Sequence, residues 1–70
     1  MDYLAIIEQA ADGSFSAYIP DLPGCTTCGD SIAEVKDLIK EAVSAHISLM
    51  REYGEPVPPA SSQSCLVRAA

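Results

Sequence analysis

The first part of the chain has the alternating pattern of apolar and polar residues that is typical of β-strands. Alternate side chains between residues 3 and 10, and again between residues 15 and 20, would point to opposite faces of a sheet. Asp12-Gly13 lies between these two segments and is a strong signal for a hairpin turn. After a further turn rich in proline and glycine, a third strand is predicted at about residues 25–28. The three segments together predict an antiparallel meander.

In the next part of the chain, apolar residues recur every three or four positions, which is the period of an amphipathic helix. Ser31 and Glu34 have the spacing of a capping box at its start, and Gly54 would end it. We therefore predict one helix over about residues 31–53. Most of its apolar side chains follow the line 32-35-39-42-46-49-53. Three further apolar side chains lie beside this line: Val43, Ile47 and Met50.

A short apolar segment at about residues 64–68 predicts a last strand. Because strand–helix–strand connections in one sheet cross over right-handed, this strand would lie beside the first strand and parallel to it, with the helix across one face. The predicted fold is a two-layer α+β sandwich of the β-β-β-α-β kind, in a single domain of residues 1–70. A domain of 70 residues has a thin core, so we expect an additional stabilising contact such as self-association.

One helix covers only one face of such a sheet, which leaves apolar side chains on the other face. If the hairpin strands pair across the turn, Leu4, Ile6 and Tyr18 share one face. The opposite face then carries Ala5, Ile7, Phe15 and Ile19. Because exposed apolar patches mark protein contacts, we predict a homo-oligomer, at least a dimer. Its expected interface residues are Leu4, Ile6, Tyr18, Val43, Ile47 and Met50.

The chain is acidic, with 10 Asp and Glu residues against 4 Lys and Arg residues, and its net charge is −6. An acidic domain repels phosphate backbones, so we expect no direct binding to nucleic acid. The charge favours a basic protein partner, although a charge of this size also serves ordinary solubility. The N-terminus lacks the basic and apolar segments of a signal peptide, and no apolar run is long enough to span a membrane. We therefore expect a cytoplasmic protein.

Cys25 and Cys28 form a C-x-x-C motif, which occurs in zinc sites and in redox proteins. A zinc site would need a second pair of ligands, for which the sequence offers Cys65 and His46. Positions three apart on a strand point to opposite faces, and a redox C-x-x-C normally opens a helix. We interpret the cysteines as structural, with metal binding and redox chemistry as the alternatives, and predict no metal or cofactor site.

No pattern in the sequence predicts a catalytic site. His46, the single histidine of the chain, lies in the apolar band of the predicted helix, which is more typical of a packed or interface side chain than of a catalytic one. Asp12, Asp21 and Asp30 lie in predicted turns, where aspartate usually stabilises the turn itself. A two-metal nuclease-like site would need these carboxylates to converge, which turns at different ends of a sheet do not favour.

The chain combines the motif Pro-Asp-Leu-Pro-Gly-Cys at residues 20–25 with Gly-Asp-Ser at residues 29–31, directly before the predicted helix. The sequence Gly-Glu-Pro-Val-Pro follows that helix at residues 54–58. In this order and spacing the chain resembles the HicB antitoxin family, in its short single-domain form, over about residues 3–59. The resemblance implies a partial ribonuclease-H-like fold without catalytic carboxylates. It also implies a non-catalytic antitoxin that binds a small basic RNA-cleaving toxin, HicA, and covers its active site.

The resemblance and the acidity together suggest where a toxin would bind. We expect Asp21, Leu22, Pro23 and Asp30 to contribute to the partner surface, the alternative being that they serve as turn residues alone. Two other functions stay open from the sequence. One is a stand-alone oligomeric binding or scaffold protein without a toxin partner, and the other is a metal-dependent nuclease.

Overall fold

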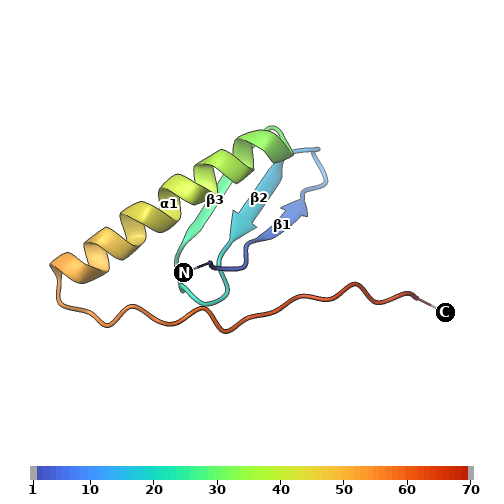
Figure 1. Cartoon of the computed structure of the whole chain (residues 1–70). Coiled ribbons are helices and arrows are strands. Elements are labelled where there is room, and N and C mark those ends of the chain that lie inside the picture. The colour runs from blue at the N-terminus through green and yellow to red at the C-terminus, as the bar shows by residue number, and fades with distance from the viewer. Residues whose placement is uncertain (1, 70) are drawn as a thin grey trace.

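A computed structural model describes residues 2–69 of the chain. Helix α1 (Ile32–Glu52) lies across one face of an antiparallel sheet, as Figure 1 shows. The sheet has the order β1-β2-β3 and is made of β1 (Ile6–Gln9), β2 (Phe15–Tyr18) and β3 (Thr26–Gly29). The predicted meander and the single long helix are confirmed, and the fold is α+β. Each strand has four residues, so β1 and β2 are shorter than predicted.

The register of the strands separates the two faces of the sheet. Ala17 lies opposite Ile7 and Thr27, and its side chain is fully buried on the helix side. Tyr18 lies opposite Ile6 on β1, and its side chain is 41% exposed. Because side chains alternate across a strand, Tyr18 and Ile6 share the face that α1 does not cover. The predicted division of the hairpin residues between two faces is therefore confirmed.

The turn between β1 and β2 is stabilised by its aspartate. The Asp12 carboxylate accepts hydrogen bonds from the backbone N–H of Ser14 at 2.9 Å and from the Ser14 hydroxyl at 2.6 Å. These bonds lower the pKa of Asp12 below its ordinary value. Gly13 follows with a φ of 91°, a left-handed conformation that glycine adopts without steric cost. Asp12-Gly13 thus forms the hairpin turn that the sequence predicts.

Two consecutive turns connect β2 to β3 and explain the conformation of the proline-rich motif. The Ile19 carbonyl accepts a hydrogen bond from the N–H of Leu22 at 3.1 Å, and the Leu22 carbonyl accepts one from Cys25 at 3.0 Å. In the second turn Pro23 fixes the first central position and Gly24 has a φ of 86°, as a type II turn requires. The double turn points the Leu22 side chain inward, where it is fully buried.

Helix α1 begins at the predicted cap. The Ser31 hydroxyl accepts a hydrogen bond from the N–H of Glu34 at 3.1 Å, which satisfies one of the free N–H groups of the first turn. The carboxylate of Glu34 lies over Gly29 at the end of β3, where a Cβ atom would come within 2.7 Å of its Oε1 atom. The absence of a side chain at Gly29 therefore lets the helix start close to the sheet.

The buried core lies between α1 and the covered face of the sheet. Its buried apolar side chains are Ala17, Ile19, Leu22, Cys25, Val35 and Ile39. The side chains that pack against it are Tyr3, Ala5, Ile7, Phe15, Ala42, Val43, Ile47 and Met50. The predicted helix line is wrong at its ends, because Ile32, Leu49 and Tyr53 are 46%, 49% and 71% exposed. That line has a period of 3.5 residues, and on a straight α-helix such a line drifts by about 20° per heptad, so its ends turn away from the sheet.

The predicted last strand is also corrected by the structure. Residues 64–68 form no strand, and Leu66 and Val67 are 105% and 83% exposed. A strand requires a neighbouring edge that satisfies its backbone groups. After α1 the chain instead passes beneath one end of the sheet and continues away from it (Figure 1).

Gly54 at the end of α1 provides a test of the helix C-cap. Its φ is 69°, and its N–H and that of Glu55 donate to helix carbonyls at 3.1 and 2.8 Å in a Schellman arrangement. A Cβ atom at this position would meet nothing within 4 Å, so only backbone conformation opposes a larger residue. We expect Gly54→Ala to lower the free energy of unfolding by about 1 kcal/mol in urea titrations at fixed protein concentration. Gly54→Asn should lose less, because asparagine tolerates this conformation, and equal stability of the alanine variant would contradict the cap.

Candidate partner-binding surfaces

Residues 55–62, which follow the end of α1, form a strap that is hydrogen-bonded to the rest of the domain at two places. The Tyr3 hydroxyl donates a hydrogen bond to the carbonyl of Pro58, 55 residues later in the sequence. Further along, Ser61 and Ser62 contact the turn after β2 through Asp21. In Figure 1 this strap runs beneath the lower end of the strands before the chain leaves the sheet. The strap therefore fixes the direction in which the C-terminal residues depart.

The carboxylate of Asp21 clamps the strap. One oxygen accepts the backbone N–H groups of Ser61 and Ser62, each at 2.9 Å. The other oxygen accepts the two serine hydroxyls at 3.0 and 2.8 Å. The backbone N–H groups of Ser62 and then Ser61 contribute most to lowering the pKa of Asp21, from 3.8 to about 2. The sequence identified Asp21 but gave no signal for this contact beyond two adjacent serines after a proline pair.

The clamp should depend on pH in a defined range. The pKa of Asp21 is lower in the folded chain, so the clamp is fully formed above the ordinary value of 3.8 and is lost as the pH falls through about 2. We expect the amide NMR signals of Ser61 and Ser62 to titrate together with a midpoint near pH 2. Asp21→Asn, which cannot ionise, should abolish that titration. A shared midpoint near 4 in the natural chain would contradict the clamp.

Two of the four residues expected to bind a partner, Asp21 and Leu22, make contacts within the fold itself. Leu22 is fully buried, so the expectation that its side chain contacts a partner is corrected: it is part of the core. Asp21 is engaged by the strap. Pro23 and Asp30 are both exposed, but they lie at opposite ends of β3. The four residues therefore do not form one continuous surface.

The face of the sheet opposite α1 is the first open surface. Ile6, Tyr18 and Thr26 lie side by side across the three strands, with Leu4 half-buried just before β1. Val43, Ile47 and Met50 lie elsewhere, on the core side of the helix, where they are half-buried. The six residues expected at an oligomer interface are thus divided between two places, and their role in oligomerisation stays a prediction.

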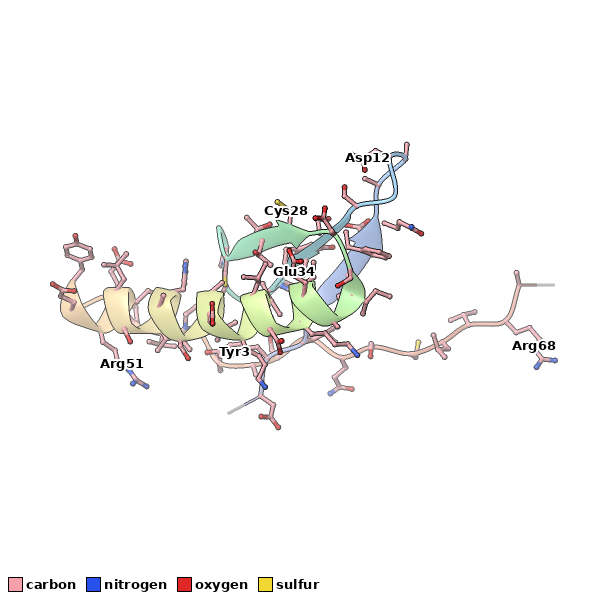
Figure 2. The ribbon with its side chains drawn as sticks, turned by 90° about the horizontal axis from the view of Figure 1, so that it is seen from above. Tyr3, Asp12, Cys28, Glu34, Arg51 and Arg68 are labelled. Atoms are coloured by element: carbon pink, nitrogen blue, oxygen red, sulfur yellow. The ribbon has the colours of Figure 1, made fainter. Side chains whose placement is uncertain are left out.

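The hairpin end of the molecule is the second open surface, and it is acidic. Four exposed carboxylates come from β1, the hairpin turn, and the junction of β3 with α1: Glu8, Asp12, Asp30 and Glu34. The basic residues lie on α1 and in the C-terminal segment: Lys36, Lys40, Arg51 and Arg68. Figure 2 shows Asp12 and Glu34 well separated from Arg51 and Arg68. This end, defined by the four carboxylates, is called the acidic end below.

The cysteines occupy three different environments. Cys25 is buried in the core, and burial raises the pKa of its thiol. Cys28 is exposed on β3 and Cys65 is exposed in the C-terminal segment. Residues 2–69 contain no group of three or more His, Cys, Asp and Glu side chains placed to hold a metal ion. The geometry therefore gives the C-x-x-C motif no shared ligand position.

The three turn aspartates do not converge either. Asp12 and Asp30 lie at the hairpin end of the sheet, because the start of β2 pairs with both the end of β1 and the end of β3. Asp21 lies at the opposite end, in the strap clamp. His46, half-buried on α1, lines a shallow depression with Cys25 and Leu49. The described residues therefore do not bring these carboxylates together in the arrangement of a two-metal site.

Comparison with known proteins places the chain in one family. A family model described as the HicB-like antitoxin of bacterial toxin–antitoxin systems matches residues 3–69. A UPF0150 protein of Thermoplasma acidophilum is 35% identical over 69 residues, which cover 99% of this chain and 100% of the relative. An uncharacterised 14.9 kDa protein of Haemophilus phage HP1, from its rep-hol intergenic region, is 41% identical over 58 residues, which cover 83% of this chain and 43% of the relative.

Among solved structures, a chain of a HicA3 and HicB3 toxin–antitoxin complex has a similar fold. The TM-score is 0.71 at 30% sequence identity, and the match covers 86% of this chain and 70% of that chain. As for membranes, none of the helices within residues 2–69 combines the length and the apolar character that a membrane span needs.

Proposed function

Because this chain belongs to the HicB-like antitoxin family of bacterial toxin–antitoxin systems, we propose that it neutralises a HicA-type, RNA-cleaving toxin by binding and covering it. The observation that carries the proposal is the similarity to a chain from a complex named for HicA3 and HicB3. The chain acts by occupying a surface and has no reaction of its own. Direct contact with RNA or DNA is not part of this role, in agreement with the net charge of −6.

We assign the acidic end as the surface that first meets the toxin. An RNA-cleaving toxin needs positive charge to bind a phosphate backbone, and the acidic end offers carboxylates to the same positive charge. Attraction of this kind raises association rates by about 10- to 1000-fold and weakens as salt increases. Asp30, which the sequence analysis expects at the partner surface, is part of this proposed surface. Pro23, at the other end of β3, would contact a toxin that extends along the sheet.

Charge reversal at the acidic end tests this assignment. Glu8 and Asp30 are exposed, so Glu8→Lys with Asp30→Lys should leave the fold intact. We expect the association rate with a HicA-type toxin to fall by about 10-fold or more at low salt, because electrostatic steering is lost. Stopped-flow binding measures the rate, and rescue of growth on co-expression measures neutralisation.

A matched variant separates local charge from total charge. Glu52→Lys with Glu55→Lys makes the same change in net charge at the C-terminal end of α1, away from the acidic end. This control should bind at nearly the natural rate. Equal losses in both double variants would mean that only net charge matters and would remove the acidic end as the contact. Failure of the natural chain to bind or neutralise the toxin would favour the stand-alone oligomeric binding protein.

A further inference from the structure

Strand β1 is an open edge of the sheet, since the order β1-β2-β3 leaves it with a neighbour on one side among the described residues. The Ala10 N–H donates to the Ser14 carbonyl at 2.8 Å, so this residue directs its backbone toward β2. In an antiparallel pair the backbone groups of alternate residues point to the same side. Ile7 and Gln9 therefore direct their N–H and C=O groups outward, where another strand can bind them.

A groove lies beside this edge, between β1 and α1. Its apolar lining comes from β1, the segment before it, the residue that follows β2 and the facing side of α1: Ala5, Ile7, Ile19, Ile39 and Val43. Lys36, Asp37 and Lys40 of the helix stand at its rim together with Asp2. The volume of the groove is about 800 Å³. The groove exists because α1 packs mainly against β3 and β2, which leaves the β1 side of the covered face open.

The C-terminal residues have the properties of the missing strand. Residues 63–69 form no helix, strand or turn. Among residues 2–69, they contain the two most exposed large apolar side chains, Leu66 and Val67. Adjacent residues of a strand point to opposite faces. In a strand beside β1, one of these two side chains would enter the groove and the other would lie beside Ile6 on the uncovered face.

The strap directs this segment away from its own sheet. Asp21 holds Ser61 and Ser62 with four hydrogen bonds, immediately before the segment begins. From there the chain runs outward, and Figure 2 places Arg68 far from both the helix and the sheet. A segment held in this direction presents its apolar residues to another molecule rather than to its own β1.

We propose that residues 63–69 of one copy bind as a fourth strand to β1 of a second copy, and that the two copies exchange these strands reciprocally. Each copy carries an unpaired strand edge, an apolar groove and an extended apolar segment. In a two-fold pair, the segment of each copy pairs with the edge of the other and fills its groove. Val43 lines the groove and Leu4 and Ile6 flank the edge, so the exchange covers three of the six residues predicted at the oligomer interface. This inference does not depend on toxin binding.

The mass of the full chain in solution is the first test. Light scattering at micromolar concentration should give twice the mass of the chain, and Leu66→Asp with Val67→Asp should give the mass of a single chain. The helical signal in far-UV circular dichroism should be kept in this variant, which shows that α1 stays folded. The matched control is Leu49→Asp with Tyr53→Asp, which removes two other exposed apolar side chains and should keep the double mass. A natural chain of single mass, or a tail variant that keeps the double mass, would overturn the proposal.

A second measurement identifies which copy supplies the strand. In a mixture of isotope-labelled and unlabelled chains, isotope-filtered NMR should detect contacts from Leu66 or Val67 of one copy to Ile7 or Val43 of the other. If the same contacts appear only within one copy, the tail folds back on its own β1 and exchange is excluded. A dimer without either set of contacts, held instead through Tyr18, would also exclude it.

Discussion

A single helix can cover one face of a three-stranded sheet but not both faces and both edges, and this constraint governs the molecule. The chain buries six apolar side chains between α1 and the sheet, and many other apolar groups stay half-buried. For so few residues, the gain from apolar burial hardly exceeds the entropy lost on ordering the chain. Additional contacts with other molecules would therefore stabilise this fold as well as serve the proposed function.

The Asp21 clamp shows how a short sequence motif orients the C-terminal segment, which could make such contacts. The proline-rich double turn that buries Leu22 also presents the carboxylate of the preceding residue to the strap. One short motif thus contributes a buried side chain to the core and determines where the C-terminal residues leave the sheet. The charge of Asp21 is required for four hydrogen bonds at once, which explains why its pKa falls to about 2 although the group stays close to solvent.

The sequence predicted the features that depend on local chemistry and missed those that depend on distant contacts. The hairpin at Asp12-Gly13, the cap at Ser31 and the stop at Gly54 each follow from a few neighbouring residues, and all three are present. The helix face was misjudged at its ends, since a heptad line ignores the 3.6-residue period of a straight helix. The clamp joins positions 40 residues apart, which no single-sequence pattern indicates.

Residues 64–68 show why a strand signal alone does not make a strand. Their apolar and β-branched residues favour an extended backbone, but the N–H and C=O groups of a strand must be satisfied by a neighbour. The direction in which the strap holds the segment, and not the sequence of the segment, decides whether that neighbour belongs to the same chain. If the neighbour is a second copy, the fold is completed only when two chains meet, so its stability rises with protein concentration. Of the four carboxylates of the acidic end, Glu8 lies on β1 itself, whereas Asp12, Asp30 and Glu34 lie outside that strand. An assembled pair would therefore leave these three carboxylates of each copy open to a toxin molecule.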